Sequence, residues 1–480
     1  MHVVIRQMLL WLLRIFILIK NNFLFIQRRF DAGIFKTSKT AYKNINCRID
    51  HNELLIQEKW LLRFLNNLLI QGRYMEAGLL SEFFAYFGHL RSDFRIIEVR
   101  ARAGLFHQSG WKVSFGMMHL QNATSQQLGL HAANLLTIYC RSVLVEWCLE
   151  VSGANEDPQH HLALANACEV AGDKQWLANL NSYLSFHSFN NLLCQPIDSD
   201  CFLGLAANFT QSPSQSFQSD SIAPLVSVCM ACYNAEKFVE VAVRSILNQT
   251  HRNIELLLFD DCSSDSTLQV LRHLAGEDER IVLIGNRVNQ GTYASRNQAL
   301  QRARGEFFTV LDADDFALPK RLAMQILHMQ ENTHHIGVMT HWVRMHPNGR
   351  FHFRSGWGGV YQHPAVATLM VRTSEVRETV GYWDCVRFSA DTEYLHRLYK
   401  VWGRKNCPTL KLPTVIALFH ENSLTNHPVT GINSNGVEEY SGARLSYRNN
   451  WSYWHKNSKS LYLPYHQTER KFPAPPEMLI

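Results

Sequence analysis

The sequence has 480 residues, of which 46% are hydrophobic, and a formal net charge of +6. This length exceeds one ordinary hydrophobic core and the composition is too apolar for a disordered chain, so two or three folded domains are predicted. The small positive charge is not gathered into one long basic run, which argues against a nucleic-acid partner. The 11 cysteines are scattered, several of them within apolar runs, and this indicates buried thiols in a reducing compartment.

Residues 1–50 form the first segment, in which polar residues recur at helical spacing within an apolar run. Arg6, Arg14, Lys20 and Arg28 would lie on one narrow stripe of a helix. The charges interrupt the apolar run well short of the roughly 18 residues of a spanning helix. We therefore expect a basic amphipathic helix lying in the membrane interface. The alternative is a helix that packs against the next domain.

Residues 51–195 carry helical periodicity throughout and are predicted to form an all-α domain. Glycine is followed shortly by an aromatic residue at Gly72, Gly110 and Gly172, which resembles the punctuation of tetratricopeptide-like repeats. Such a domain would offer a scaffold surface for a partner or acceptor, or would only support the part that follows. Residues 196–222 are predicted to be a linker, because the run at 208–221 is polar and rich in turn formers.

After Pro224 short apolar strands alternate with amphipathic helices. Strands are expected at 225–231, 254–259, 281–284 and 307–311, and helices at 236–248, 266–274 and 293–304. This alternation predicts an α/β domain with a mostly parallel, Rossmann-like sheet covered on both faces. Ligands of such sheets bind in the crevice beyond the carboxyl ends of the strands.

Acidic residues follow two of these strands. The second strand leads into Asp260-Asp261-Cys-Ser-Ser-Asp265 and the fourth into Asp312-Ala-Asp314-Asp315. Carboxylates brought together repel one another, and burying them without a partner is costly, so they require a cation or donor groups of a ligand. Mg²⁺ and Mn²⁺ use one or two protein carboxylates and leave their other positions to phosphate oxygens and water. A divalent cation bound together with a diphosphate would neutralise the clustered carboxylates and fill the remaining coordination positions of the metal.

An ordered series of motifs resembles glycosyltransferase family 2, the inverting transferases with a GT-A fold. The resemblance covers residues 224–426 and rests on Val226-Ser-Val-Cys-Met-Ala-Cys-Tyr-Asn234, Ser245-Ile-Leu-Asn-Gln-Thr250, Ile254 to Thr267, Asn289-Gln-Gly291, Arg296-Asn297, Gly305 to Asp315 and Pro319-Lys-Arg-Leu322. It implies a GT-A domain at 223–426. The residues that follow, 427–480, are rich in Asn, Tyr, Trp and Pro, and we expect them to form an extension that packs on the catalytic domain.

The resemblance also implies roles for individual residues around a nucleotide-sugar donor. Tyr233 would flank the base, Asp261 would accept hydrogen bonds from base or ribose, Arg296 would lie near the donor, Asp312 near the ribose, and Asp314 on the metal, with Asp315 as the competing ligand. His420 resembles a late histidine that some relatives bring to the metal or diphosphate, and a packing role for it is equally open.

A catalytic base is implied near the start of a helix in Ser389-Ala-Asp391-Thr-Glu393. Asp391 is the expected base that accepts the proton of the acceptor hydroxyl, and Glu393 is the alternative. Asp391 could instead serve only as a helix N-cap. Trp357 among glycines could offer an apolar face to an acceptor sugar or could anchor its loop.

The expected function is metal-dependent inverting transfer from a nucleotide sugar, with a UDP-sugar as the expected donor, to a glycan or lipid-linked acceptor. The resemblance and the first segment together suggest synthesis of bacterial cell-surface polysaccharide, in the cytoplasm at the inner face of the plasma membrane. The alternative is a helical scaffold whose transferase domain has decayed. The retained acids at Asp261, Asp314 and Asp391 argue against that alternative.

Overall fold

The computed structural model describes residues 153–168, 171–189, 192, 194–207, 223–354, 360–420, 432–433, 439–440 and 442–480, with a few positions between 126 and 150. The expected interfacial helix in 1–50, most of the expected helical domain, the polar run at 208–222 and Trp357 lie outside these residues.

Strand–helix repeats build the first half of the sheet domain, as the sequence predicts. The elements are β1 (Val226–Cys232), α12 (Val239–Leu247), β2 (Ile254–Asp260), α13 (Thr267–Glu277), β3 (Ile281–Gly285), α14 (Thr292–Arg302) and β4 (Phe307–Val310). Their strands pair in parallel in the order β3-β2-β1-β4. All four strands therefore end at the same edge of the sheet.

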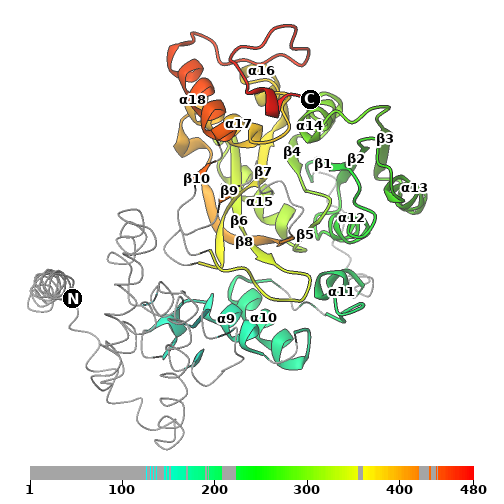
Figure 1. The fold of residues 1–480 in the computed structure, drawn as a ribbon, viewed down its shortest axis with the longest axis vertical. Helices are drawn as coiled ribbons and strands as arrows, with labels where there is room; N and C mark the ends of the chain where they lie inside the picture. The colour runs from blue at the N-terminus through cyan, green and yellow to red at the C-terminus, as the bar shows by residue number, and fades with distance from the viewer. Residues whose placement is uncertain are drawn as a thin grey trace, which may run out of the picture.

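The second half of the domain extends this sheet with strands of both directions (Figure 1). Its elements are β5 (Asp315–Ala317), α15 (Arg321–Glu331), β6 (Gly337–Met345), β7 (Gln362–Arg372), α16 (Thr373–Thr379), α17 (Ala390–Trp402), η4 (Arg404–Asn406) and β8 (Thr409–Leu418). The full order is β3-β2-β1-β4-β7-β6-β8-β5. Three of its seven pairings, β4–β7, β6–β7 and β5–β8, are antiparallel.

The expected parallel pairing is thus found among β1 to β4 and again between β6 and β8, whereas the other three pairings are antiparallel. The described residues between β6 and β7, 346–354 and 360–361, form no crossover helix, and strands connected in this way can pair antiparallel. The result is a mixed α/β sheet consistent with a nucleotide-sugar-binding domain of GT-A type.

Both faces of the sheet are buried, as the alternation along β1 shows. Val228 and Met230 pack in one core with α12, α13 and α15, whereas Cys229 packs in a second core with α14, α17 and α18 (Gly442–Asn457). This period of two is the signature of a strand whose side chains point alternately to opposite faces. The C-terminal elements therefore belong to the second core.

Four helical elements precede the sheet domain: η1 (Ala154–Glu156), α9 (His160–Ala167), α10 (Lys174–Phe186) and α11 (Cys201–Ala207). They pack at the end of the sheet that carries β5 and β8 (Figure 1). They share a core with Phe316, Val343 and Ile416 of the sheet. Trp176 lies against Phe351, with ring centroids 5.8 Å apart, and its indole N–H donates to the carbonyl of Gly349.

The predicted linker at 196–222 is wrong in its first part. Helix α11 occupies 201–207, and Cys201 and Phe202 are buried in the core shared with the sheet. The apolar run Cys-Phe-Leu-Gly-Leu at 201–205 explains this packing, because burying these side chains is favourable, whereas a linker would leave them exposed to water. Only the polar run at 208–222 keeps a linker composition.

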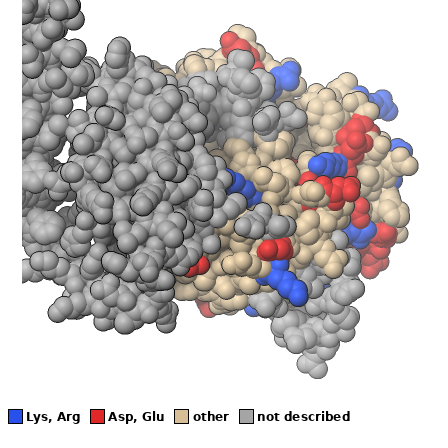
Figure 2. Space-filling view, turned by 60° about the horizontal axis from the view of Figure 1, so that its bottom comes forward, with Lys and Arg blue, Asp and Glu red and all other residues tan. Residues whose placement is uncertain are grey.

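The remaining elements are η5 (Pro476–Met478) and the short pair β9 (Ile432–Asn433) and β10 (Glu439–Tyr440). Figure 2 shows one face of the molecule, where acidic and basic side chains of the described residues lie next to one another and no broad area carries charge of one sign. Within the part of the chain that the structure describes, no helix is both long and apolar enough to cross a membrane.

Candidate active site

The site lies at the carboxyl edge of the parallel strands. The loop after β2 carries Asp261, and the segment after β4 carries Asp312 and Asp314. Since β1, β2 and β4 are parallel neighbours, these loops meet at one edge. The sequence prediction that the acids gather at one edge agrees with this placement.

Asp261 is only 2% exposed and accepts hydrogen bonds from the protein itself. Its Oδ1 accepts from Asn286 Nδ2 at 2.8 Å and from the backbone N–H of Gln290 at 2.9 Å, and its Oδ2 accepts from the N–H of Gly291 at 2.7 Å. Gly291 has φ +78°, which favours glycine. Both oxygens of this buried carboxylate therefore hold the loop that leads into α14. Its expected contact with base or ribose stays a prediction.

Helix α14 begins beside this loop and places a buried cation under the acidic segment. Arg296 is 6% exposed and its Nη2 lies 2.7 Å from Oδ1 of Asp312. Burial alone would lower the pKa of Arg296, but Asp312, Tyr293 and Asp391 raise it. The guanidinium therefore remains charged and reaches the site through Asp312, which is 42% exposed.

Strand pairing brings Asp314 to His420. Asp315 of β5 pairs with Ala417 of β8, and His420 follows β8 by two residues. As a result Nε2 of His420 lies 2.9 Å from Oδ2 of Asp314, and their side chains are 26% and 31% exposed. The structure therefore brings together the two residues to which the resemblance assigns the metal.

Asp315, the expected competing ligand, is placed differently. It is 4% exposed, and burial, then the charges of Asp314 and Asp312, raise its pKa well above its usual range. Asp315 is the first residue of β5, and all three residues of this strand are buried. The structure thus removes Asp315 from the open side of the site.

The pair Asp314–His420 fits a divalent cation that takes few protein ligands. In the described ranges no group of three or more histidine, cysteine or acidic side chains could enclose a metal. One carboxylate and one imidazole leave most coordination positions to phosphate oxygens and water. An imidazole ligand suits Mn²⁺ better than Mg²⁺, which prefers oxygen.

Asp391 lies in the first turn of α17, and it is half-buried. The N-cap is Ser389, with φ +71°, so the alternative that Asp391 serves only as the N-cap is wrong. Oδ1 of Asp391 accepts from the N–H of Thr392 at 2.8 Å, and Tyr293 of α14 forms a side-chain hydrogen bond with it. The positive end of the helix stabilises this carboxylate.

Asp391 is also close enough to Arg296 and Asp312 to alter the pKa of each. The pKa of Asp312 is raised, because loss of hydration and the charges of Asp314 and Asp391 outweigh the opposing charge of Arg296. Acids from two separate regions of the chain therefore lie near one another beside α14.

Glu393 does not reach the site. It is fully buried, and its Oε1 accepts from Arg397 Nε at 3.0 Å and from His455 Nε2 at 2.9 Å. Its Oε2 accepts from Arg397 Nη2 at 2.9 Å. The alternative assignment of Glu393 as base is wrong, because its carboxylate is fully buried and is paired with Arg397 of the same helix and with His455 of α18.

The loop after β1 presents Tyr233, whose side chain is 53% exposed. The next residue, Asn234, uses its Oδ1 to accept from the N–H of Ser264, at 2.8 Å, and this joins the loop to the one that follows β2. An exposed aromatic ring on an anchored loop can stack on a planar ligand.

Residues of the C-terminal extension border the same region. The carbonyls of Met478 and Leu479 accept from the N–H and Nε of Arg387, both at 2.8 Å. A methyl group added at Gly291 would lie 2.9 Å from Cδ1 of Ile480. The segment 478–480 therefore spans from the loop before α17 to the loop that Asp261 holds.

Comparison with known proteins identifies this domain. Residues 227–391 match the family model Glycosyl transferase family 2. The chain contains a glycosyltransferase domain. The matched region runs from β1 to Asp391, so it includes the acids described above.

Several similar proteins are also named as glycosyltransferases. An uncharacterized glycosyltransferase of Haemophilus influenzae is 41% identical over 118 residues, which are 25% of this chain and 46% of that protein. The Escherichia coli protein UDP-Glc:alpha-D-GlcNAc-diphosphoundecaprenol beta-1,3-glucosyltransferase WfgD is 43% identical over 108 residues, 22% of this chain and 42% of the relative. The chain thus spans less than half the length of these relatives.

Among solved structures, S. aureus TarS 1-349 in complex with UDP-GlcNAc is similar, with 22% sequence identity and a TM-score of 0.34, over 41% of this chain and 59% of that chain.

Several residues of the transferase domain were not predicted from the sequence. Tyr293, which contacts Asp391, lies three positions before Arg296 on α14, and that spacing puts both on one helix face. Arg344 of β6 has its cation close to Asp314 and Asp315, which raise its pKa against the lowering effect of burial. The spacing on α14 was a usable signal, whereas nothing local marks Arg344.

Proposed function

We propose that the transferase domain moves a glycosyl group from a nucleotide diphosphate sugar to an acceptor hydroxyl, with inversion at the anomeric carbon and with a divalent cation. The carrying observation is the convergence of Asp391, the Arg296–Asp312 pair and the Asp314–His420 pair at the carboxyl edge of the sheet. The match of this region to a glycosyltransferase family supports the proposal.

The donor nucleotide would lie between the loops after β1 and β2. The ring of Tyr233 would stack on the base, and the loop held by Asp261 would border the ribose through its backbone groups. The names of the relatives WfgD and WfaP state UDP-Glc as their donor, which supports a UDP-sugar here.

Asp314 and His420 would hold the cation together with the donor diphosphate. Such an ion neutralises the negative charge that develops on the leaving diphosphate. Arg344, whose guanidinium lies over the ring of Phe419 at 4.7 Å, adds a fixed positive charge behind the pair. Arg296 orients Asp312 toward the ribose side of the same space.

Asp391 would accept the proton of the acceptor hydroxyl while the oxygen attacks the anomeric carbon. The oxygen–carbon bond forms as the bond to the leaving phosphate breaks, so no covalent enzyme intermediate is needed. Tyr293 and the start of α17 fix the direction of the carboxylate.

The acceptor would be a glycan or a lipid-linked saccharide of the bacterial cell surface. Similar proteins are named for teichuronic acid biosynthesis in Bacillus subtilis and for colanic acid biosynthesis in Escherichia coli. WfgD is named for a diphosphoundecaprenol-linked acceptor. These names support a polysaccharide pathway whose acceptor is presented at a membrane surface.

The decisive experiment is donor binding by calorimetry with UDP-, GDP- and CMP-sugars, each with manganese and with a chelator. We expect one nucleotide class to bind, to require the metal, and to be hydrolysed slowly. A scaffold with a decayed transferase domain predicts no metal-dependent binding of any of the three, and that result would overturn the proposal.

A further inference from the structure

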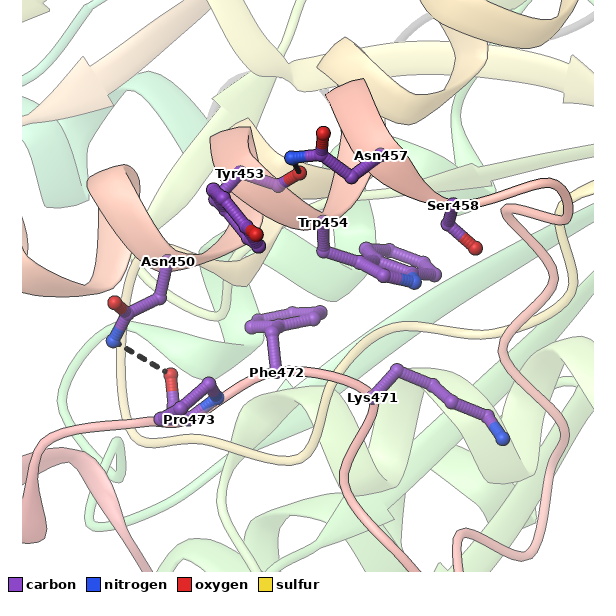
Figure 3. Close-up of a pocket in the computed structure, with 8 residues that line it drawn as sticks. All are labelled: Asn450, Tyr453, Trp454, Asn457, Ser458, Lys471, Phe472 and Pro473. Atoms are coloured by element: carbon purple, nitrogen blue, oxygen red, sulfur yellow. Dashed lines mark hydrogen bonds between the residues drawn. The ribbon is translucent and has the colours of Figure 1, made fainter.

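A cavity of about 460 Å³ lies outside the catalytic edge, between α18 and the segment 471–473 (Figure 3). It is lined by Asn450, Tyr453, Trp454, Asn457, Ser458, Lys471, Phe472 and Pro473. The volume is in the range of small-molecule sites in proteins. None of these residues takes part in the proposed transfer.

Aromatic rings form the floor and one side of the cavity. Trp454 stacks on Phe472 with centroids 5.1 Å apart, and both rings are largely buried. Tyr453 is 72% exposed and points from α18 toward the ring of Phe472 (Figure 3). A rigid exposed ring beside a buried aromatic floor offers a flat apolar surface at low entropic cost.

Amide groups border this surface. Asn450 Nδ2 donates to the carbonyl of Pro473 at 3.1 Å, and Asn457 Nδ2 donates to the carbonyl of Tyr453 at 2.8 Å. These bonds fix the orientation of both side chains and engage only one of the amide hydrogens of each. The amide oxygens remain as acceptors for hydroxyl groups.

Charge further limits what the cavity can hold. Lys471 is the one charged residue among the eight that line it. The cavity therefore has no carboxylate that would repel an acidic sugar, and its cation could pair with one.

The cavity is connected to the catalytic edge by α18 itself. Arg444, in the first turn of α18, donates from Nη1 to Oγ of Ser389, the N-cap of the helix that carries Asp391. Nine residues separate Arg444 from Tyr453, about 14 Å along the helix at 1.5 Å per residue. A chain of a few sugar units bridges a distance of this order.

We propose that this cavity binds a saccharide unit of the acceptor glycan, some units away from the hydroxyl that is glycosylated. Ring faces stack on the apolar side of a pyranose, and fixed amides and a cation meet its hydroxyl and carboxylate groups. The identity of the occupant rests on the proposed function, because only a glycosyltransferase gives this surface a glycan partner.

The test is direct binding of three tetrasaccharides, of β-1,4-linked glucose, β-1,4-linked N-acetylglucosamine and α-1,4-linked galacturonic acid, to the full chain. Tryptophan fluorescence and saturation-transfer NMR report the binding without donor or catalysis. We expect at least one probe to bind. Tyr453→Ala should weaken it by about fivefold or more, which is the size of one aromatic contact. Phe186→Ala, at an equally exposed ring on α10, is the matched control and should leave it unchanged.

Lys471→Gln adds a second arm: it should weaken the galacturonic acid probe and spare the two neutral probes. The proposal is overturned by a chain that binds none of the three probes, or by binding that Tyr453→Ala and Phe186→Ala affect equally. Failure of metal-dependent nucleotide-sugar binding would instead remove the proposed function, so the two failures are distinguishable.

Discussion

The substitution Asp391→Asn, compared with Glu393→Gln, distinguishes the role of the proposed base from that of its buried neighbour. The Asn Oδ1 can still accept from the N–H of Thr392, so the helix start is kept and the lost charge costs only about 0.3–1 kcal/mol of folding free energy. Transfer should fall about 10²- to 10⁴-fold, the contribution of a general base. Binding of the nucleotide sugar should remain nearly intact.

Glu393→Gln should behave in the opposite way. It removes the negative charge that Arg397 and His455 contact in a fully buried setting, and breaking such a pair costs about 3–5 kcal/mol. In a domain of this size we expect the melting temperature to fall by about 10 °C. Enzyme that remains folded should retain transfer.

The assays are transfer with a radiolabelled donor, calorimetry for donor binding and differential scanning calorimetry for stability, each on both variants. The reasoning is refuted by an Asp391→Asn enzyme that keeps transfer within about tenfold of the parent. It is equally refuted by a Glu393→Gln enzyme that melts normally and has lost transfer.

Two further predictions rest on contacts described above, and a third rests on His363, a buried residue of β7. His420→Ala should weaken manganese binding in the presence of UDP by about tenfold or more, measured by calorimetry, because one of two protein ligands is lost; unchanged binding would exclude His420 from the site. Deleting residues 478–480 should raise the KM for the donor severalfold and leave the kcat less affected, because Ile480 lies against Gly291; an unchanged KM in steady-state kinetics would contradict this. Burial lowers the pKa of His363 to about 3, so below the unfolded value near 6.5 the unfolded chain binds the extra proton, and stability should fall by up to about 1.4 kcal/mol per pH unit from pH 6.5 toward 3. In urea titrations across that range, His363→Gln should flatten the dependence, and an unaltered slope would show that this histidine does not contribute.

The parallel half of the sheet was predictable because local periodicity and strand ends specify it. Each expected strand and helix between 225 and 311 is present in the structure, and the acids of the loops meet where the rule for parallel sheets places them. The second half depends on non-local pairing, and nothing in the sequence of β5 shows that it adds to β8.

The placement of a side chain agrees with its expected role only where the residue is exposed. Tyr233, Asp314 and His420 remain accessible, as their expected roles require. Asp261 and Asp315 are buried, and burial follows from packing and register that a single sequence does not display. An acidic residue in a motif therefore predicts that a carboxylate is required at that position. It does not show whether the carboxylate binds groups of the protein or groups of the ligand.

The core that α9, α10 and α11 share with β5, β6 and β8 has a consequence for how this protein should be handled. A fragment that starts at the first strand of the sheet would expose Phe316, Val343 and Ile416 to water, and such surfaces promote aggregation. We therefore expect the helices and the transferase domain to melt in a single transition. Expression of the catalytic half alone should yield insoluble protein unless the helices are retained.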